Sequence, residues 1–152
     1  LSVGLGMALE ARVSKRDFRV FVILGDGEIN EGHIWEAATA ASKFKADNLV
    51  AIVDRNRLQM DGFCEDVMPM GDIQAKFRAF GWETMGMNGH DMKDILLTID
   101  KALLVQDKPT VIVAETVKGK GVSYMEDVCA WHGRCPSDDE FTCAMDEIGG
   151  DA

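Results

Sequence analysis

The fold is decided by VFVILGDGE, residues Val20–Glu28, and by LVAIVDRNRL, residues Leu49–Leu58. Each stretch begins with five apolar residues in succession, a pattern typical of a strand buried on both faces of a parallel sheet. Each then becomes polar at once, through Gly-Asp-Gly in the first stretch and Asp-Arg-Asn in the second. We therefore expect buried strands over Val20–Leu24 and Leu49–Val53, with polar side chains just beyond their carboxyl ends.

Strands and helices alternate along the rest of the chain. Apolar periodicity and flanking Gly, Pro and Asp residues indicate helices of 8 to 14 residues between the strands. The expected helices are Leu1–Arg12, Glu31–Phe44, Ile73–Phe80, Met92–Val105 and one from Ser137 or Asp138 to Met145, and the further strands are Trp82–Met87 and Thr110–Glu115. The stretch Asp54–Met70 is expected to be irregular. The alternation predicts an α/β fold, a mostly parallel sheet with helices on both faces, in a single domain over residues 1–152.

Composition excludes several classes of protein. Hydrophobic residues make up 47% of the 152, enough for a core, which excludes wholesale disorder. No apolar run approaches the length of a membrane-spanning helix. The net charge of −10 argues against binding to nucleic acid or to a membrane surface, because phosphates need clustered Lys and Arg. The chain starts at Leu1 without a signal-peptide pattern, so we expect a cytoplasmic protein, as a fragment truncated at its start.

The candidate chemistry lies where the two decisive strands end. In open α/β sheets, ligands bind beyond the carboxyl ends of the strands. Asp26 and Asn56 are 30 residues apart, one strand-helix-strand unit, so neighbouring strands would bring both side chains to one crevice. A carboxylate and an amide oxygen suit Mg²⁺, which usually completes its shell with phosphates and water. Gly27 lacks a Cβ, so a phosphate can approach its backbone. A tight Gly-Asp-Gly turn and a separate Asn turn would explain the same residues.

Two familiar nucleotide-binding patterns are incomplete. Gly25–Asn30 begins like G-x-G-x-x-G but has Asn30 in place of the third glycine, and Gly4–Leu9 fails at the same place. No G-x-x-x-x-G-K-[ST] sequence is present. The sequence therefore disfavours a dinucleotide site and a P-loop.

A more extended set of motifs resembles the thiamine diphosphate signature of the transketolases. Its general form, Gly-Asp-Gly followed about thirty residues later by Asn, is shared by thiamine diphosphate enzymes. The Asn-Glu-Gly and Trp-Glu-Ala continuation is closer to the transketolases than to the 2-oxoacid dehydrogenases. The matching segments are Leu1–Leu9, Leu24–Glu28, Asn30–Gly32, Trp35–Ala37, Asp54–Leu58, Lys118–Val122 and Trp131–Gly133. The resemblance spans Leu1 to Ile148 and implies a thiamine diphosphate-binding fold.

The resemblance also implies roles for particular residues. Mg²⁺ would be bound by Asp26, Asn56 and the backbone carbonyl of Leu58. Gly27 and Asn56 would contact the diphosphate of the cofactor, and Lys118 would lie near its phosphates. The residues alone also allow Lys118 to be a solvated charge.

Two further roles follow from the same resemblance. His132 would lie between the diphosphate and the substrate, although the residues alone also allow a packed loop histidine. Glu31, and with it Glu36, matches acidic residues of a carboxylate network near a dimer interface; a solvated helix start is the alternative. His90 is expected to organise a turn and cap the next helix, without a chemical role.

The activity implied is the transfer of a two-carbon ketol unit between sugar phosphates, as in the pentose phosphate reactions of carbohydrate metabolism. A glutamate that activates the cofactor belongs to a pyrimidine-binding domain, and no part of this chain corresponds to it. That domain would be a separate polypeptide, as in split transketolases, or the C-terminal part of a long transketolase. We therefore expect a homo- or hetero-oligomer and an isolated chain without activity.

Three alternatives stay open at this point. Cys129, His132, Cys135 and Cys143 have the spacing C-x₂-H-x₂-C-x₇-C, close to structural zinc patterns. A non-catalytic α/β binding domain is the second. The third is another thiamine diphosphate enzyme subunit, of the deoxyxylulose-phosphate synthase or 2-oxoacid dehydrogenase type. Those enzymes usually lack the pairing of Glu31-Gly32 with Trp131–Gly133.

The alanine-rich helix predicts one more surface. Ile34–Ala41 places small or apolar residues around much of the helix, so that more than one side can pack closely. We expect one side to meet the sheet and another to be an exposed apolar surface for a second subunit.

Overall fold

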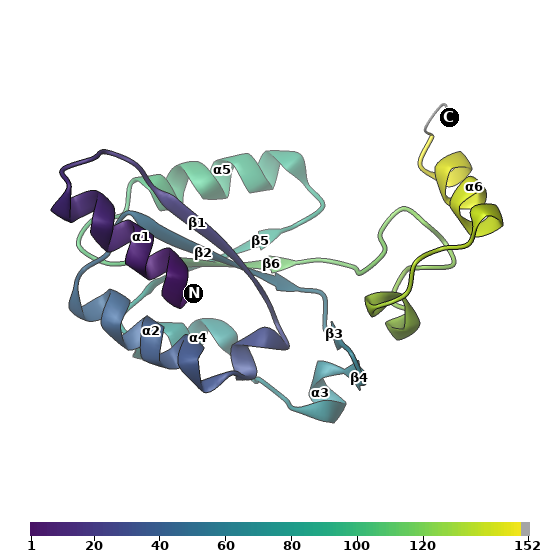
Figure 1. Ribbon diagram of the computed structural model, residues 1–152, viewed down its shortest axis with the longest axis horizontal. Coiled ribbons are helices and arrows are strands. Elements are labelled where there is room, and N and C mark those ends of the chain that lie inside the picture. Colours follow the sequence, from purple (N-terminus) through teal and green to yellow (C-terminus); the bar gives the residue numbers. More distant parts are fainter. Residues whose placement is uncertain (150–152) are drawn as a thin grey trace.

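A computed structural model describes residues 1–149, and the last three residues of the predicted 1–152 domain lie outside the described residues. Within that part, four strands form a sheet in the order β1-β2-β6-β5, with every pairing parallel. The strands are β1 (Val20–Gly25), β2 (Leu49–Arg55), β5 (Glu83–Asn88) and β6 (Thr110–Glu115). Helices lie on both faces (Figure 1), which confirms the predicted α/β class.

The helices within residues 1–149 divide unequally between the two faces of the sheet. On one face α1 (Ser2–Val13), α2 (Gly32–Lys43) and α4 (Ile73–Ala79) share a core cluster with β1, β2 and β6. On the other face α5 (Met92–Leu103) forms a second cluster with β2, β5 and β6. Figure 1 shows α5 on one side of the sheet and α2 and α4 on the other. No helix in the described range is both long enough and apolar enough to cross a membrane.

The first strand differs from its prediction in burial. β2 and β6 occupy the middle of the sheet and are buried along most of their length. β1 lies at the edge, where Phe21 is 46% and Ile23 is 74% exposed. The expectation that Val20–Leu24 is buried on both faces is therefore wrong. The reason is that α5 packs over β2, β5 and β6, and its core cluster takes no residue from β1.

The exposed apolar surface predicted for Ile34–Ala41 is also wrong. Ile34, Ala38 and Ala41 are fully buried in the core of their own domain, and Ala37 is nearly so. The exposed residues of α2 are polar or glycine and include Glu36, Thr39 and Lys43. The small side chains of α2 therefore pack against α1 and into the core of their own domain, rather than forming a face for a partner.

The stretch predicted to be irregular contains a small hairpin. β3 (Leu58–Gln59) pairs antiparallel with β4 (Gly62–Phe63), and the short helix α3 (Cys64–Val67) follows. The turn before β3 places Arg57 at a φ of +65°, in the left-handed region. The hairpin thus folds back directly beyond the carboxyl end of β2.

Beyond β6 the chain continues as a C-terminal arm, residues 116–149, which extends away from the sheet (Figure 1). It contains a 3-10 turn, η2 (Cys129–His132), and the helix α6 (Asp138–Glu147). Ser137 caps α6 in a capping box with Glu140, so the helix starts where the sequence predicts.

Aromatic contacts hold the C-terminal arm together. The Tyr124 hydroxyl donates to the carbonyl of Glu140 at 2.5 Å, and the Trp131 indole N–H donates to the carbonyl of Tyr124 at 3.0 Å. The Arg134 guanidinium lies 4.2 Å from the centre of the Trp131 ring. The arm is therefore a small folded unit that holds η2 in a defined place.

A pair of glycines in α1 tests the packing of this layer. A Cβ at Gly4 would lie 2.3 Å from Cγ2 of Val22, whereas a Cβ at Gly6 would meet nothing within 4 Å. Gly4→Ala should lower the free energy of unfolding by about 1–3 kcal/mol, because the helix must shift from β1. Gly6→Ala should raise it by up to about 1 kcal/mol through helix propensity. Urea denaturation measures both, and equal shifts would contradict this packing.

Candidate functional site

The carboxyl ends of β1 and β2 border a cavity of about 380 Å³. Gly25 of β1 pairs in register with Asp54 of β2, so the residues that follow the two strands meet at one edge of the sheet. Of the predicted site residues, this cavity brings together Asp26, Gly27, Asn56, Leu58 and His132. Its lining is completed by Gly25, Glu28, Gln59 and Met60.

Asp26 is the buried polar residue at the centre of this edge, with only 4% of its surface exposed. Its Oδ1 accepts hydrogen bonds from the backbone N–H of Gly27 at 2.8 Å and from the Cys64 thiol at 3.3 Å. Its Oδ2 accepts from the backbone N–H of Arg57 at 2.5 Å. Burial, together with the Asp26 carboxylate, raises the pKa of the Cys64 thiol to about 11, which keeps this donor protonated. Asp26 therefore ties β1 to the turn after β2.

Asn56 lies in that turn with its amide fixed at both ends. Its Oδ1 accepts from the backbone N–H of Leu58 at 3.0 Å, and its Nδ2 donates to Oδ2 of Asp54 at 3.3 Å. Leu58 is buried and is the first residue of β3. A carboxylate, an amide oxygen and a backbone segment thus converge on the same cavity.

Gly27 meets the hairpin closely. A Cβ at this position would lie 3.0 Å from Cβ and 3.2 Å from Oε1 of Gln59, so a larger residue would force the hairpin away. The Nε2 atom of Gln59 is buried without a hydrogen-bond partner among the described residues. An unpaired buried donor costs free energy, because it has given up its hydrogen bonds to water. A 3-10 turn, η1 (Glu28–Asn30), separates Gly27 from α2, whose N-cap is Glu31, the predicted start of that helix.

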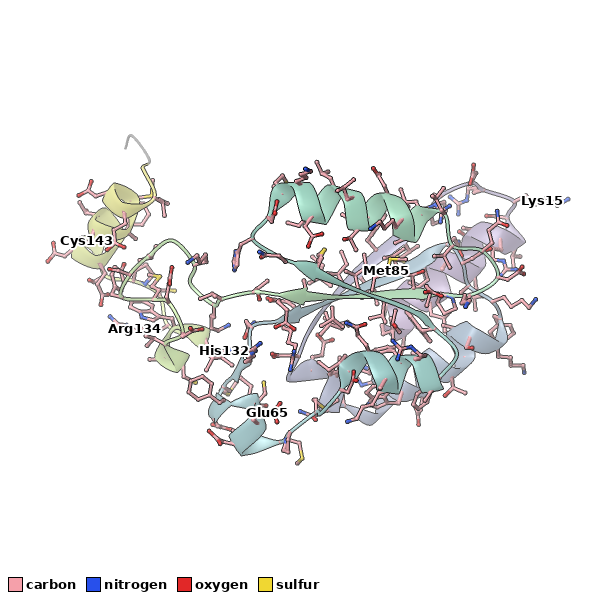
Figure 2. The ribbon with its side chains drawn as sticks, turned by 180° about the vertical axis from the view of Figure 1, so that it is seen from behind. Lys15, Glu65, Met85, His132, Arg134 and Cys143 are labelled. Atoms are coloured by element: carbon pink, nitrogen blue, oxygen red, sulfur yellow. The ribbon has the colours of Figure 1, made fainter. Side chains whose placement is uncertain are left out.

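His132 reaches the cavity from the C-terminal arm (Figure 2). The Cys129 thiol holds η2 against the hairpin by donating to the carbonyls of Gln59 at 2.9 Å and Met60 at 3.3 Å. Sequence reasoning considered Cys129 only as a zinc ligand. In the described part of the chain, no three His, Cys, Asp or Glu side chains gather to hold a metal, and Cys143 lies on α6 away from His132 (Figure 2).

Three predicted site residues lie elsewhere. Lys118 is partly buried in the loop after β6 and does not line this cavity; its carbonyl accepts from the N–H of Asp127 at 3.0 Å. Glu31 is the exposed N-cap of α2, and Glu36 is exposed on the same helix. Their proposed roles stay predictions.

A second cavity of about 800 Å³ adjoins the first and shares Asn56 with it. It follows the carboxyl ends of β5 and β6 and includes His90, Glu115 and Thr116. The His90 Nε2 accepts from the backbone N–H of Val117 at 2.8 Å, so His90 binds the start of the arm. His90 was expected to cap α5, but the cap is Asp91.

Sequence reasoning missed the polar residues that support Asn56. Asp54 and Thr116 are joined by a hydrogen bond from the threonine hydroxyl, at the ends of β2 and β6. Their position just after apolar runs was a usable signal, since ligand sites gather beyond carboxyl ends of strands. The pairing itself depends on β2 and β6 being neighbours, which the sequence order does not reveal.

Of the carboxylates at this edge, Glu115 is paired with two arginines. Arg55 Nη1 donates to Oε1 of Glu115 at 2.6 Å, and Arg57 Nη2 donates to Oε2 at 3.0 Å. Burial would raise the pKa of Glu115, but hydrogen bonds from the two guanidinium groups outweigh it and lower that pKa. The first cavity keeps Asp26 and Glu28 against a single basic side chain, His132. An anionic ligand would need a cation there.

Comparison with known proteins assigns this chain to a family. The family described as "Transketolase, thiamine diphosphate binding domain" matches residues 9–152. This chain belongs to that family. The resemblance seen in the sequence is thereby confirmed, and so is the fold. A transketolase from Campylobacter jejuni superposes with a TM-score of 0.91 at 27% identity, over 97% of this chain and 24% of its own.

Two of the relatives of this transketolase-family chain are named as subunits of transketolases. A subunit of the apulose-4-phosphate transketolase of Phocaeicola vulgatus is 45% identical over 148 residues, covering 97% of this chain and 53% of the relative. A subunit of the 6-deoxy-6-sulfo-D-fructose transketolase of a Clostridium species is 35% identical over 147 residues, covering 97% of this chain and 54% of the relative. The chain thus spans about half the length of these curated relatives.

The Glu115 pairs predict a pH-dependent contribution to stability. A lowered pKa in the folded state contributes stability above the ordinary value of 4.5, and this is lost as the pH falls through the folded-state pKa. Glu115→Gln should therefore destabilise the protein at neutral pH by about 0.5–1 kcal/mol, since the side chain is 45% exposed and solvent screens the pairs.

Thermal unfolding across the acid range checks this expectation. Glu83→Gln is the matched control, because Glu83 forms one ion pair, with Lys108, where Glu115 forms two. A Glu115→Gln deficit that keeps its full size at acid pH would show that charge pairing is not its cause.

Proposed function

We propose that this chain binds the diphosphate of thiamine diphosphate through Mg²⁺ and serves in ketol transfer between sugar phosphates. The observation that carries the proposal is the single cavity shared by Asp26, Gly27, Asn56, Leu58 and His132, in a member of the transketolase family. These are the residues that the resemblance associates with metal, diphosphate and substrate.

The residues present fit a hydrated magnesium ion with a diphosphate. Asp26 and Asn56 offer oxygen atoms, and the carbonyl of Leu58 would be the third protein ligand, which is the hard donor set that Mg²⁺ prefers. The carboxylates that line the cavity would otherwise repel a diphosphate, so the cation resolves the charge conflict.

Each residue then has a defined task. When bound, thiamine diphosphate supplies the electron sink for breaking and forming the carbon–carbon bond. Gly27 leaves room for the diphosphate beside the hairpin, and Cys129 keeps His132 at the cavity. His132 is exposed there, where it would hydrogen-bond substrate and move protons.

Two tasks rest on the resemblance rather than on the cavity. Lys118 would approach the cofactor phosphates from the arm, and Glu31 would join a carboxylate network with a second subunit. Both are accessible for these tasks, since Lys118 is partly exposed and Glu31 is exposed.

We further propose that a partner polypeptide completes the site. Relatives that this chain matches over half their length are named as subunits of transketolases, one for apulose 4-phosphate and one for 6-deoxy-6-sulfo-D-fructose. A polypeptide that carries a pyrimidine-binding domain would make a hetero-oligomer, with a sugar phosphate as substrate. The cytoplasmic location stays a prediction.

Asp26→Asn tests the metal site in the assembled protein. The variant keeps the shape of the side chain but should weaken Mg²⁺-dependent thiamine diphosphate binding by at least about 10-fold, because ligand-shell changes have effects of this size. It should also lower stability by about 1–3 kcal/mol, since its NH₂ group must face a backbone N–H of Gly27 or Arg57. We therefore expect Asp26→Asn to weaken cofactor binding and to lower folding stability together.

Calorimetric titration with and without Mg²⁺ measures the affinity, below the melting temperature of the variant. Asp61→Asn is the matched control, an exposed carboxylate on the same hairpin that does not line the cavity. Unchanged Mg²⁺-dependent affinity in folded Asp26→Asn protein would remove Asp26 from the ligand set.

The purified 152-residue chain should show no transketolase activity by itself. The reason is that the activating glutamate and the pyrimidine half of the cofactor site would belong to another domain. A coupled assay with a ketose phosphate donor and an aldose phosphate acceptor measures this. Turnover without any second polypeptide would disprove the requirement for a partner.

A further inference from the structure

An amide side chain can present either its oxygen or its nitrogen to a neighbour, and only the oxygen can bind a metal ion. The proposed role of Asn56 as a ligand therefore requires that its amide be held in one orientation. In the structure, Oδ1 lies toward the backbone N–H of Leu58 and Nδ2 toward the carboxylate of Asp54. The inference below rests on the proposed function.

Both neighbours oppose rotation of the Asn56 amide by half a turn. After such a rotation, Nδ2 would face the N–H of Leu58, donor against donor, and Oδ1 would face Oδ2 of Asp54, acceptor against acceptor. The Leu58 N–H is fixed by the backbone at the start of β3. To fix the Asn56 amide, the Asp54 side chain must also be held in place.

Thr116 holds Asp54 from the adjacent strand. Its hydroxyl donates to Oδ1 of Asp54, the carboxylate oxygen that Asn56 does not use, and its backbone N–H donates to the carbonyl of Arg55 at 3.3 Å. Asp54 pairs with Ala114 in the β2–β6 register, and Thr116 directly follows β6, so the two side chains meet at the carboxyl ends of neighbouring strands. Each carboxylate oxygen thus has one dedicated donor.

Thr116 is in turn confined by the turn after β5. The N–H of Gly89 donates to the carbonyl of Glu115 at 2.8 Å, and a Cβ at Gly89 would lie 2.4 Å from Cγ2 of Thr116. On the following residue, the N–H of Val117 donates to Nε2 of His90 at 2.8 Å. The threonine is therefore clamped between β2 and this turn.

We propose that Asp54 and Thr116 are positioning residues, which fix the Asn56 amide with its oxygen available to a divalent cation. Neither lines the smaller cavity, so they act through Asn56. A purely electrostatic role for the Asp54 charge makes a different prediction. Loss of the Thr116 hydroxyl leaves that charge unchanged, so it should affect metal binding only if orientation matters.

The experiment measures Mn²⁺ affinity in the assembled protein at saturating thiamine diphosphate, by the electron paramagnetic resonance signal of free Mn²⁺. Thr116→Val should weaken Mn²⁺ binding roughly 10-fold, the lower end of the effect of an outer-shell partner. Asp54→Leu should weaken it at least as much, because it removes the acceptor that holds Nδ2 of Asn56. Thr116→Ser keeps the hydroxyl and should restore the affinity.

Thr110→Val is the matched control. Thr110 is buried at the opposite end of β6, far from the carboxyl edge, and its substitution should leave Mn²⁺ affinity unchanged. Melting of the metal-free proteins separates a loss of fold from a loss of orientation. Asp54→Leu provides the second variant if Thr116→Val does not fold.

The outcomes distinguish failure of the positioning role from failure of the proposed function. Wild-type Mn²⁺ affinity in folded Thr116→Val or Asp54→Leu protein would overturn the positioning role while leaving the metal site intact. Equal weakening by Thr116→Ser and Thr116→Val would also overturn it. Absence of metal-dependent thiamine diphosphate binding in the wild-type protein would overturn the proposed function, and the positioning role with it.

Discussion

The site depends on one buried carboxylate that is bonded mainly to backbone. Asp26 accepts hydrogen bonds from the N–H groups of Gly27 and Arg57, and so joins the end of β1 to the turn that follows β2. A buried charge is tolerated only where donors or a cation compensate it. The same interaction therefore shapes the turn that carries Asn56 and creates an acidic edge that favours a cation. The Asp26 carboxylate thus accounts both for the shape of the site and for its preference for a cation.

The parallel sheet explains why such a site can form from distant parts of the chain. Strands β1, β2 and β6 lie side by side, so polar residues that follow each of them share one edge. The C-terminal arm returns to that edge through Cys129, which brings His132 close to Asn56. Membership in the transketolase thiamine diphosphate-binding family supports the proposal that this edge of the sheet binds the cofactor. The proposed partner would supply the other half of the cofactor site.

Periodicity and spacing predicted the elements well because each depends on local sequence. The alternation of strands and helices is visible in the local pattern of apolar residues. The approach of Asp26 to Asn56 follows from the one strand-helix-strand unit that separates them. Burial of β1 was not predictable in the same way, because Phe21 and Ile23 have the composition of core residues and only the position of α5 leaves them exposed. The hydrogen bond from Thr116 to Asp54 depends on strand order, which a single sequence does not state.

Anomalous diffraction from crystals of the assembled protein with thiamine diphosphate and Mn²⁺ tests the proposed metal site most directly. We expect one Mn²⁺ peak at bonding distance from the Asp26 carboxylate, the Asn56 amide oxygen and the Leu58 carbonyl, next to the cofactor diphosphate. A cofactor bound with its Mn²⁺ away from Asp26 and Asn56 would contradict it.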